Sequence, residues 1–127
     1  MSFHLSKTSR GRLAGVHPAL VAVVERAIQR TPVDFRVTEG VRTAARQADL
    51  VKAGASRTLK SRHLTGHAVD VAALVGGQVR WDWPLYGRIA LAFKQAAAEL
   101  ATPLVWGGDW RSFRDGPHFE LDRRAFL

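Results

Sequence analysis

Residues 61–74 read SRHLTGHAVDVAAL, the end of a basic loop followed by an apolar segment. Its second half predicts a strand over His67–Leu74, because Val69 and Val71 recur at every second position and lie on one face. Asp70 lies on the other face, in the middle of this apolar strand. A lone carboxylate there is costly to remove from water unless a cation or hydrogen-bond donors meet it. The strand is therefore predicted to belong to a sheet and to carry part of a site.

Helices and strands are predicted on both sides of this strand. Apolar residues at helical spacing predict a helix that begins near Pro18 and stops at Thr31, and a longest helix from Asp82 to about Leu100. A short helix and four further strands complete the pattern: Thr43–Ala53, then Val33–Thr38, Gln78–Trp81, Leu104–Trp106 and Pro117–Leu121. Helices packed on a small, mostly antiparallel sheet make an α+β domain.

The length and composition are those of one globular domain. The chain has 127 residues, 46% of them hydrophobic, and no internal repeat or long linker, so we expect a single domain over residues 1–127. Residues 1–16 are polar and basic, and we expect them to pack as an irregular arm. The chain has no cysteine, which excludes disulfides and thiolate-bound metals. A metal site must therefore use His, Asp and Glu.

The charge favours an anionic partner. The formal net charge is +8 at pH 7, with 19 Lys+Arg against 11 Asp+Glu. Such a balance suits nucleic acid, a membrane surface or a polyanionic cell wall. No apolar run approaches the ~18 residues of a membrane span, and the first residues lack the apolar segment of a secretory signal. We expect no transmembrane segment, and any export by another route.

Three residues far apart in the chain can meet on the polar face of the sheet. His63 precedes Asp70 by seven residues, and His118 lies in the last predicted strand, where it shares a face with Glu120. If the two strands are neighbours, two imidazoles and a carboxylate converge. That set leaves the fourth position of a tetrahedral zinc ion open, which is typical of a catalytic site.

Spacing alone leaves two other interpretations open. Asp70 can instead form an ion pair with Arg62 or Arg42, with the two histidines unrelated to it. His63 and His67 can form a rival ligand pair if their segment is helical, since residues four apart share a helix face. A glycine and β-branched neighbours disfavour a helix there, so His67 is interpreted as a flanking residue.

Other charged residues could complete a hydrolytic site. Asp115 lies three residues before His118, and the intervening Gly-Pro turn can fold its carboxylate back as a general base. Glu120 can accept the second N–H of the His118 ring, and is the other candidate for the base. Arg42 is well placed to hold a substrate carboxylate or a polarised carbonyl.

Three segments resemble known enzymes. Residues 61–70, SRHLTGHAVD, fit the S-x-H-x-x-G-x-A-x-D pattern of the zinc D-Ala-D-Ala carboxypeptidase and endopeptidase families. Residues 115–120, DGPHFE, resemble the second metal segment of these families. Residues 105–110, VWGGDW, and the small size resemble one branch in particular. That branch is the L-alanyl-D-glutamate endopeptidases of phage endolysins and related bacterial wall hydrolases.

The resemblance implies a Hedgehog/D-Ala-D-Ala peptidase-like fold and a role for each site residue. It implies that His63, Asp70 and His118 bind one Zn²⁺ on the sheet face. It also implies that Asp115 is the catalytic base. Arg42 matches the arginine of the first family motif and would bind substrate, and Ser61 matches a motif serine assigned to the same substrate site.

The implied function is zinc-dependent hydrolysis of the L-Ala–D-Glu bond in peptidoglycan stem peptides, as in endolysin-like wall lysis. A D-Ala-D-Ala carboxypeptidase is the alternative on the same site. A basic nucleic-acid-binding module is an alternative from another class, which the charge and four tryptophans permit.

The resemblance also implies partners and a place of action. We expect peptidoglycan stem peptides as the partner, no nucleic acid, a monomer, and no separate wall-binding module. We expect synthesis in a host cytoplasm without a signal peptide, and action on the wall in the periplasm after release.

Overall fold

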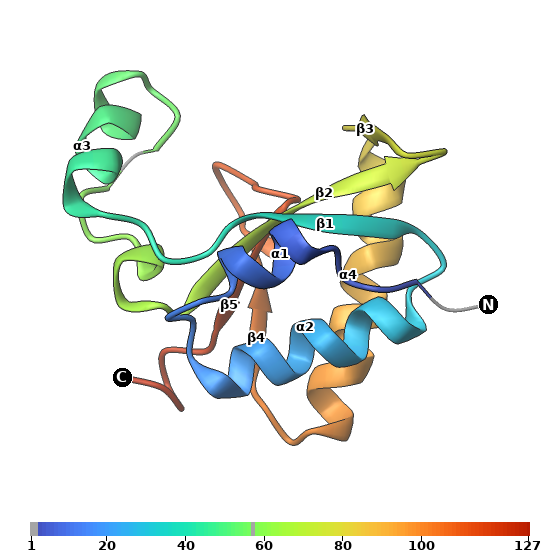
Figure 1. Cartoon of the computed structure of the whole chain (residues 1–127). Coiled ribbons are helices and arrows are strands. Elements are labelled where there is room, and N and C mark those ends of the chain that lie inside the picture. The colour runs from blue at the N-terminus through green and yellow to red at the C-terminus, as the bar shows by residue number, and fades with distance from the viewer. Residues whose placement is uncertain (1–2, 57) are drawn as a thin grey trace.

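The sheet is antiparallel throughout the described residues, which are 3–56 and 58–127 of a computed structural model (Figure 1). In that part of the chain, four strands run in the order β1-β2-β5-β4, and β3 pairs with the far end of β2. The strands are β1 (Asp34–Glu39), β2 (Ala68–Val75), β3 (Gln78–Arg80), β4 (Leu104–Trp106) and β5 (His118–Leu121). The prediction of an α+β fold with a mostly antiparallel sheet is confirmed.

Two long helices cover one face of this sheet. They are α2 (Pro18–Arg30) and α4 (Trp83–Glu99), which pack against each other; in Figure 1, α2 lies below the strands and α4 runs downward behind them. The core forms between them and the sheet: Phe93 of α4 stacks on Phe119 of β5, with ring centroids 3.9 Å apart. Phe119 and Leu121 therefore face the core. Since side chains alternate along a strand, His118 and Glu120 face the opposite side.

The N-terminal segment differs from its prediction. The expected irregular arm over residues 1–16 is wrong for α1 (Lys7–Arg12), a short helix capped by Ser6. Ser9 accepts a hydrogen bond from the backbone N–H of Val37, and Arg12 donates one to the Val37 carbonyl. These bonds cover part of the outer edge of β1, which would otherwise expose unpaired backbone groups. The helix lacks an apolar repeat, so periodicity could not reveal it.

Two short helices lie on the other side of the molecule. Helix α3 (Ala44–Lys52) begins at its predicted cap, Thr43, and stands apart from the α2–α4 layer in Figure 1. A 3₁₀ turn, η1 (Arg62–Thr65), precedes β2 and ends at Gly66, whose φ of 76° lies in the left-handed region that glycine tolerates. None of the helices in the two described ranges is both long and apolar enough to span a membrane.

Candidate active site

His63, Asp70 and His118 converge on the face of the sheet that the long helices leave uncovered. Asp70 and His118 are directly opposite each other in the β2–β5 ladder, and η1 places His63 above them. His63 Nε2 lies 3.3 Å from one Asp70 oxygen, and His118 Nδ1 lies 3.2 Å from the other. One ligand atom from each residue lies within 4.8 Å of the others, so the group could bind a metal ion.

The outer nitrogen of each imidazole is already hydrogen-bonded. His63 Nδ1 lies 2.9 Å from the Gly40 carbonyl, which can only accept, so we assign the proton to this nitrogen. His118 Nε2 lies 2.9 Å from Glu120 Oε1 and donates to that carboxylate. The inner nitrogens, Nε2 of His63 and Nδ1 of His118, therefore face Asp70. Second hydrogen bonds of this kind orient metal-binding histidines and fix their tautomers.

One buried atom shows that the donor set suits a cation. His63 Nε2 is buried and has no hydrogen-bond partner of adequate geometry, although it points at Asp70. An unpartnered lone pair is costly in a buried position. A divalent cation would satisfy that lone pair, and imidazole nitrogens with a carboxylate oxygen are the ligands that zinc accepts.

The carboxylates around His118 also favour a positive charge between the three converging residues. Burial opposes the charged form of His118, but hydrogen bonds with Asp70 and Glu120 outweigh it and raise the pKa of His118 to about 9. Burial would raise the pKa of Asp70, but its hydrogen bond with His118 and the proximity of the two imidazoles hold it well below its usual value. Asp70 is thus a carboxylate at neutral pH, facing either a protonated His118 or, in place of the proton, a metal ion.

Asp115 borders the same cleft without joining the three residues. Its backbone N–H donates to the Gly107 carbonyl (3.0 Å), and its carbonyl accepts from the His118 N–H (3.2 Å). A Cβ on Gly107 would collide with the backbone carbonyl oxygen of Asp115, so this approach requires glycine. Burial and the charge of Asp70 raise the pKa of the Asp115 carboxyl. A raised pKa makes the Asp115 carboxylate a better proton acceptor.

Arg42 is held in a network of polar side chains. Its guanidinium donates two hydrogen bonds of 2.8 Å to the Glu39 carboxylate and approaches Asp70 Oδ2 at 3.4 Å. The interpretation in which Asp70 pairs with an arginine and the histidines are unrelated is wrong, because Asp70 contacts both histidines as well. Arg62 instead donates to the Leu121 and Phe126 carbonyls.

Gln47 belongs to the same network, and sequence reasoning missed it. It is the buried residue of α3, where its Oε1 accepts a 2.7 Å hydrogen bond from Arg42. Its amide donates to Ser56 Oγ (2.8 Å) and to the Thr58 carbonyl. Gln47 therefore ties Arg42 to the loop after α3. In the sequence, Gln47 is a polar residue on the inward face of a short amphipathic helix. Spacing alone does not distinguish such a residue from one on the surface.

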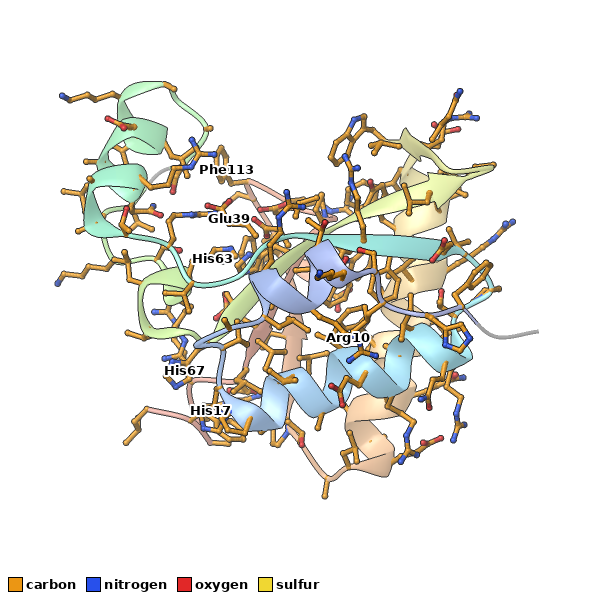
Figure 2. The ribbon with its side chains drawn as sticks, in the orientation of Figure 1. Arg10, His17, Glu39, His63, His67 and Phe113 are labelled. Atoms are coloured by element: carbon orange, nitrogen blue, oxygen red, sulfur yellow. The ribbon has the colours of Figure 1, made fainter. Side chains whose placement is uncertain are left out.

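Two further predicted residues support the histidines. Ser61 caps η1 by accepting a hydrogen bond from the His63 N–H (3.2 Å), so it positions that ring. Glu120 holds His118 as expected, and this bond keeps the Glu120 pKa low despite burial, which would raise it. His67 lies away from the group, with its ring centroid 5.5 Å from that of His17 (Figure 2). The rival ligand pair of His63 and His67 is thus not formed.

A cleft of about 350 Å³ opens above the three converging residues. One wall comes from α3 and the loop after it, and the other from the segment between β4 and β5. Phe113 of that second wall lies above Glu39 and His63 in Figure 2. The cleft is lined by Leu50, Ser56 and Thr58 on one side, Trp110, Phe113 and Asp115 on the other, and Arg42, His63, Asp70 and His118 at the base.

Replacing Glu39 by glutamine should destabilise the protein in a pH-dependent way. Hydrogen bonds from Arg42 hold the pKa of Glu39 below its usual value, so the ionised form contributes stability above about pH 4.5 and loses it as the pH falls through the lowered pKa. We expect E39Q to lose about 1–2 kcal/mol at pH 7, as for a hydrogen bond to a charged group. Urea unfolding in EDTA at pH 7 and pH 3 measures this.

The matched control is Asp109→Asn, which removes an exposed ion pair with Lys94. It should change the free energy of unfolding by less than about 0.5 kcal/mol. An E39Q deficit that is equal at pH 3 and pH 7 would show that the charge of Glu39 does not contribute.

Comparison with known proteins identifies the family of this chain. The profile of the family described as phage L-alanyl-D-glutamate peptidase matches residues 1–126. The chain belongs to this family. It is 37% identical to the L-alanyl-D-glutamate peptidase of Escherichia phage T5, over 99% of this chain and 94% of that protein.

Two further proteins support the assignment to this family. The chain is 32% identical to the peptidoglycan L-alanyl-D-glutamate endopeptidase CwlK of Bacillus subtilis, over 70% of this chain and 61% of CwlK. The crystal structure of the Serratia marcescens L-Ala D-Glu endopeptidase ChiX matches with a TM-score of 0.93 and 47% identity, over 98% of this chain and 94% of that chain. The resemblance drawn from residues 61–70 and 115–120 is therefore confirmed at the level of the family and the fold.

Proposed function

We propose that this chain is a zinc-dependent peptidoglycan hydrolase that cleaves the amide bond between L-Ala and D-Glu in stem peptides. The observation that carries the proposal is the convergence of His63, Asp70 and His118, with both outer ring nitrogens hydrogen-bonded and both inner ones facing Asp70. The names of the family and of its relatives support the bond that is cut.

Zinc would be held by His63 Nε2, Asp70 and His118 Nδ1. When bound there, it supplies Lewis acidity, which activates water and polarises a carbonyl. The Gly40 carbonyl and the Glu120 carboxylate keep the two rings in the orientation that this requires. We propose zinc rather than a hard cation such as Mg²⁺ because two of the three donors are imidazoles.

The chain's own residues would bind the substrate and move its proton. The Asp115 carboxylate would accept a proton from the attacking water and return it to the leaving amine of D-Glu. Its raised pKa suits the first step, because a carboxylate with a higher pKa takes up a proton more readily. Arg42 would hold a substrate carboxylate or the carbonyl oxygen, and the Glu39 and Gln47 bonds would keep its guanidinium in place. Ser61 would contribute through the position of His63.

The charge and the chain organisation fit this proposal. The +8 net charge would draw the protein to the anionic wall, and we propose that residues 1–127 act as one peptidase domain. We also propose that the protein acts as a monomer on stem peptides, on the wall side of the membrane after release from a host cytoplasm.

Digestion of purified sacculi tests the reaction and its bond specificity. We expect wall digestion to stop after EDTA treatment and dialysis, and to return with stoichiometric zinc. Mass spectrometry of the products should show new amino-terminal D-Glu. Free D-Ala would instead indicate the D-Ala-D-Ala carboxypeptidase. Full activity of metal-free protein would contradict the proposal.

A further inference from the structure

Exposed aromatic side chains gather next to the loop that carries Asp115. Within residues 3–56 and 58–127, the large exposed aromatics are Trp81 (64% exposed), Trp83 (44%) and Phe113 (50%). Trp83 packs on that loop: a Cβ on Gly116 would lie 3.2 Å from its ring. The Arg114 guanidinium lies over the Trp83 ring, 4.6 Å from its centroid. Trp83 and Arg114 therefore lie beside the loop that carries Asp115, next to Phe113, which lines the cleft.

Trp81 offers a second flat surface, which Tyr86 supports. Its ring is parallel to that of Tyr86, with an interplanar angle of 4° and centroids 6.0 Å apart. Tyr86 is itself fixed, because its hydroxyl accepts from the Ala73 N–H (3.1 Å) and donates to the Arg80 carbonyl (2.8 Å). Tyr86 also borders Gly116. Trp81 thus has one side backed by a rigid ring and most of its area open to solvent.

The chemistry of this surface suits a sugar. The C–H face of a pyranose ring is apolar and slightly positive, so it packs on the negative face of an indole. Arg114 is anchored by its Nε bond to the Gly108 carbonyl (2.9 Å), which leaves its terminal N–H groups to meet hydroxyl or acetamido oxygens.

The connectivity of the wall indicates which sugar would lie there. In peptidoglycan, L-Ala is the residue that joins the stem peptide to the glycan strand. A residue spans at most about 3.6 Å, so the sugar that carries the stem lies within roughly 10 Å of the L-Ala–D-Glu bond. A substrate held for attack beside Asp115 would therefore place its glycan within reach of the side chains that pack on the Asp115 loop.

We propose that Trp81, backed by Tyr86, forms with Trp83 and Arg114 a platform that binds the glycan strand next to the cleavage site. The identity of the ligand rests on the proposed function. The platform would supply wall affinity within the catalytic domain and would favour stems still attached to glycan over free stem peptides.

Binding of peptide-free glycan tests the platform without any hydrolysis. The probe is a wall tetrasaccharide from which the stem peptides have been removed, titrated into the zinc-loaded protein and followed by NMR. We expect Trp81→Ala to weaken binding at least fivefold and Trp81→Phe to retain part of the affinity. The control is Leu91→Ala, which removes a similarly exposed side chain (59%) from α4 and should bind like the wild type.

Equal binding by W81A and the wild type would overturn the proposal, as would an equal loss in L91A. Tighter binding of a single-stranded oligonucleotide than of the glycan, lost in W81A, would assign the surface to nucleic acid and overturn it too. Melting temperatures show that the variants fold.

A kinetic comparison separates this proposal from the proposed function. We expect the wild type to cleave a disaccharide-linked stem with at least tenfold higher kcat/KM than the free stem peptide, and we expect this ratio to fall toward one in W81A. An unchanged ratio would overturn the platform. Hydrolysis of neither substrate at the L-Ala–D-Glu bond would overturn the peptidase proposal, while the tetrasaccharide titration would still decide whether Trp81 binds glycan.

Discussion

Replacing Asp70 by asparagine should yield a folded protein that neither retains a divalent ion nor digests peptidoglycan. Asp70 is the centre of the cluster, because each of its oxygens faces one imidazole. Loss of hydrogen-bond partners behind metal ligands typically costs ~10–100-fold in metal affinity or activity, and loss of a ligand should exceed this. Dialysis against buffered zinc followed by elemental analysis measures the occupancy, and a sacculus assay measures the rate.

The Asp109→Asn variant is the matched control, since it makes the same chemical change at an exposed carboxylate. It should bind one zinc per chain and digest sacculi like the wild type. A D70N protein that keeps stoichiometric zinc at wild-type affinity would exclude Asp70 as a ligand. Near-wild-type digestion by D70N would exclude the site as a whole.

Replacing Asp115 by asparagine should separate metal binding from catalysis. The side chain borders the cleft but is not among the three converging residues, so D115N should bind zinc like the wild type. Loss of a general base typically lowers the rate ~10²–10⁴-fold. We expect a loss of this size in kcat, with zinc content near one per chain.

Glu120→Gln distinguishes the two candidate bases. Glu120 is occupied by its hydrogen bond to His118, so its replacement should act on metal affinity, with activity that recovers at high zinc concentration. D115N should show no such recovery. A rate loss in E120Q that excess zinc does not restore, together with an active D115N, would move the role of the base to Glu120.

Local signals were sufficient to predict most of the fold. Helix α2 begins at Pro18 and α3 is capped by Thr43, both as the pattern of apolar residues and caps indicates. The same alternation of side chains placed His118 and Glu120 on one face of β5, which the structure confirms. Such signals involve residues close in sequence. The elements that they predict are present in the folded protein because their apolar faces pack in the core.

The remaining features depend on contacts between distant segments. Spacing could not decide between a metal cluster and an ion pair, because that depends on the β2–β5 register, which joins Asp70 to a residue 48 positions away. Helix α1 has no apolar repeat and is stabilised by bonds to β1. Gln47 acquires its role through hydrogen bonds with Arg42 and Thr58, which lie outside its own helix.

The pairing of Asp70 with His118 also links folding to activity. A slip of one residue between β2 and β5 would turn His118 and Glu120 into the apolar interior and expose Phe119 to water. Misregistered chains would therefore lose both the packing of the core and the approach of His118 to Asp70. The register that buries the apolar side chains of β5 is thus the same register that assembles the candidate active site.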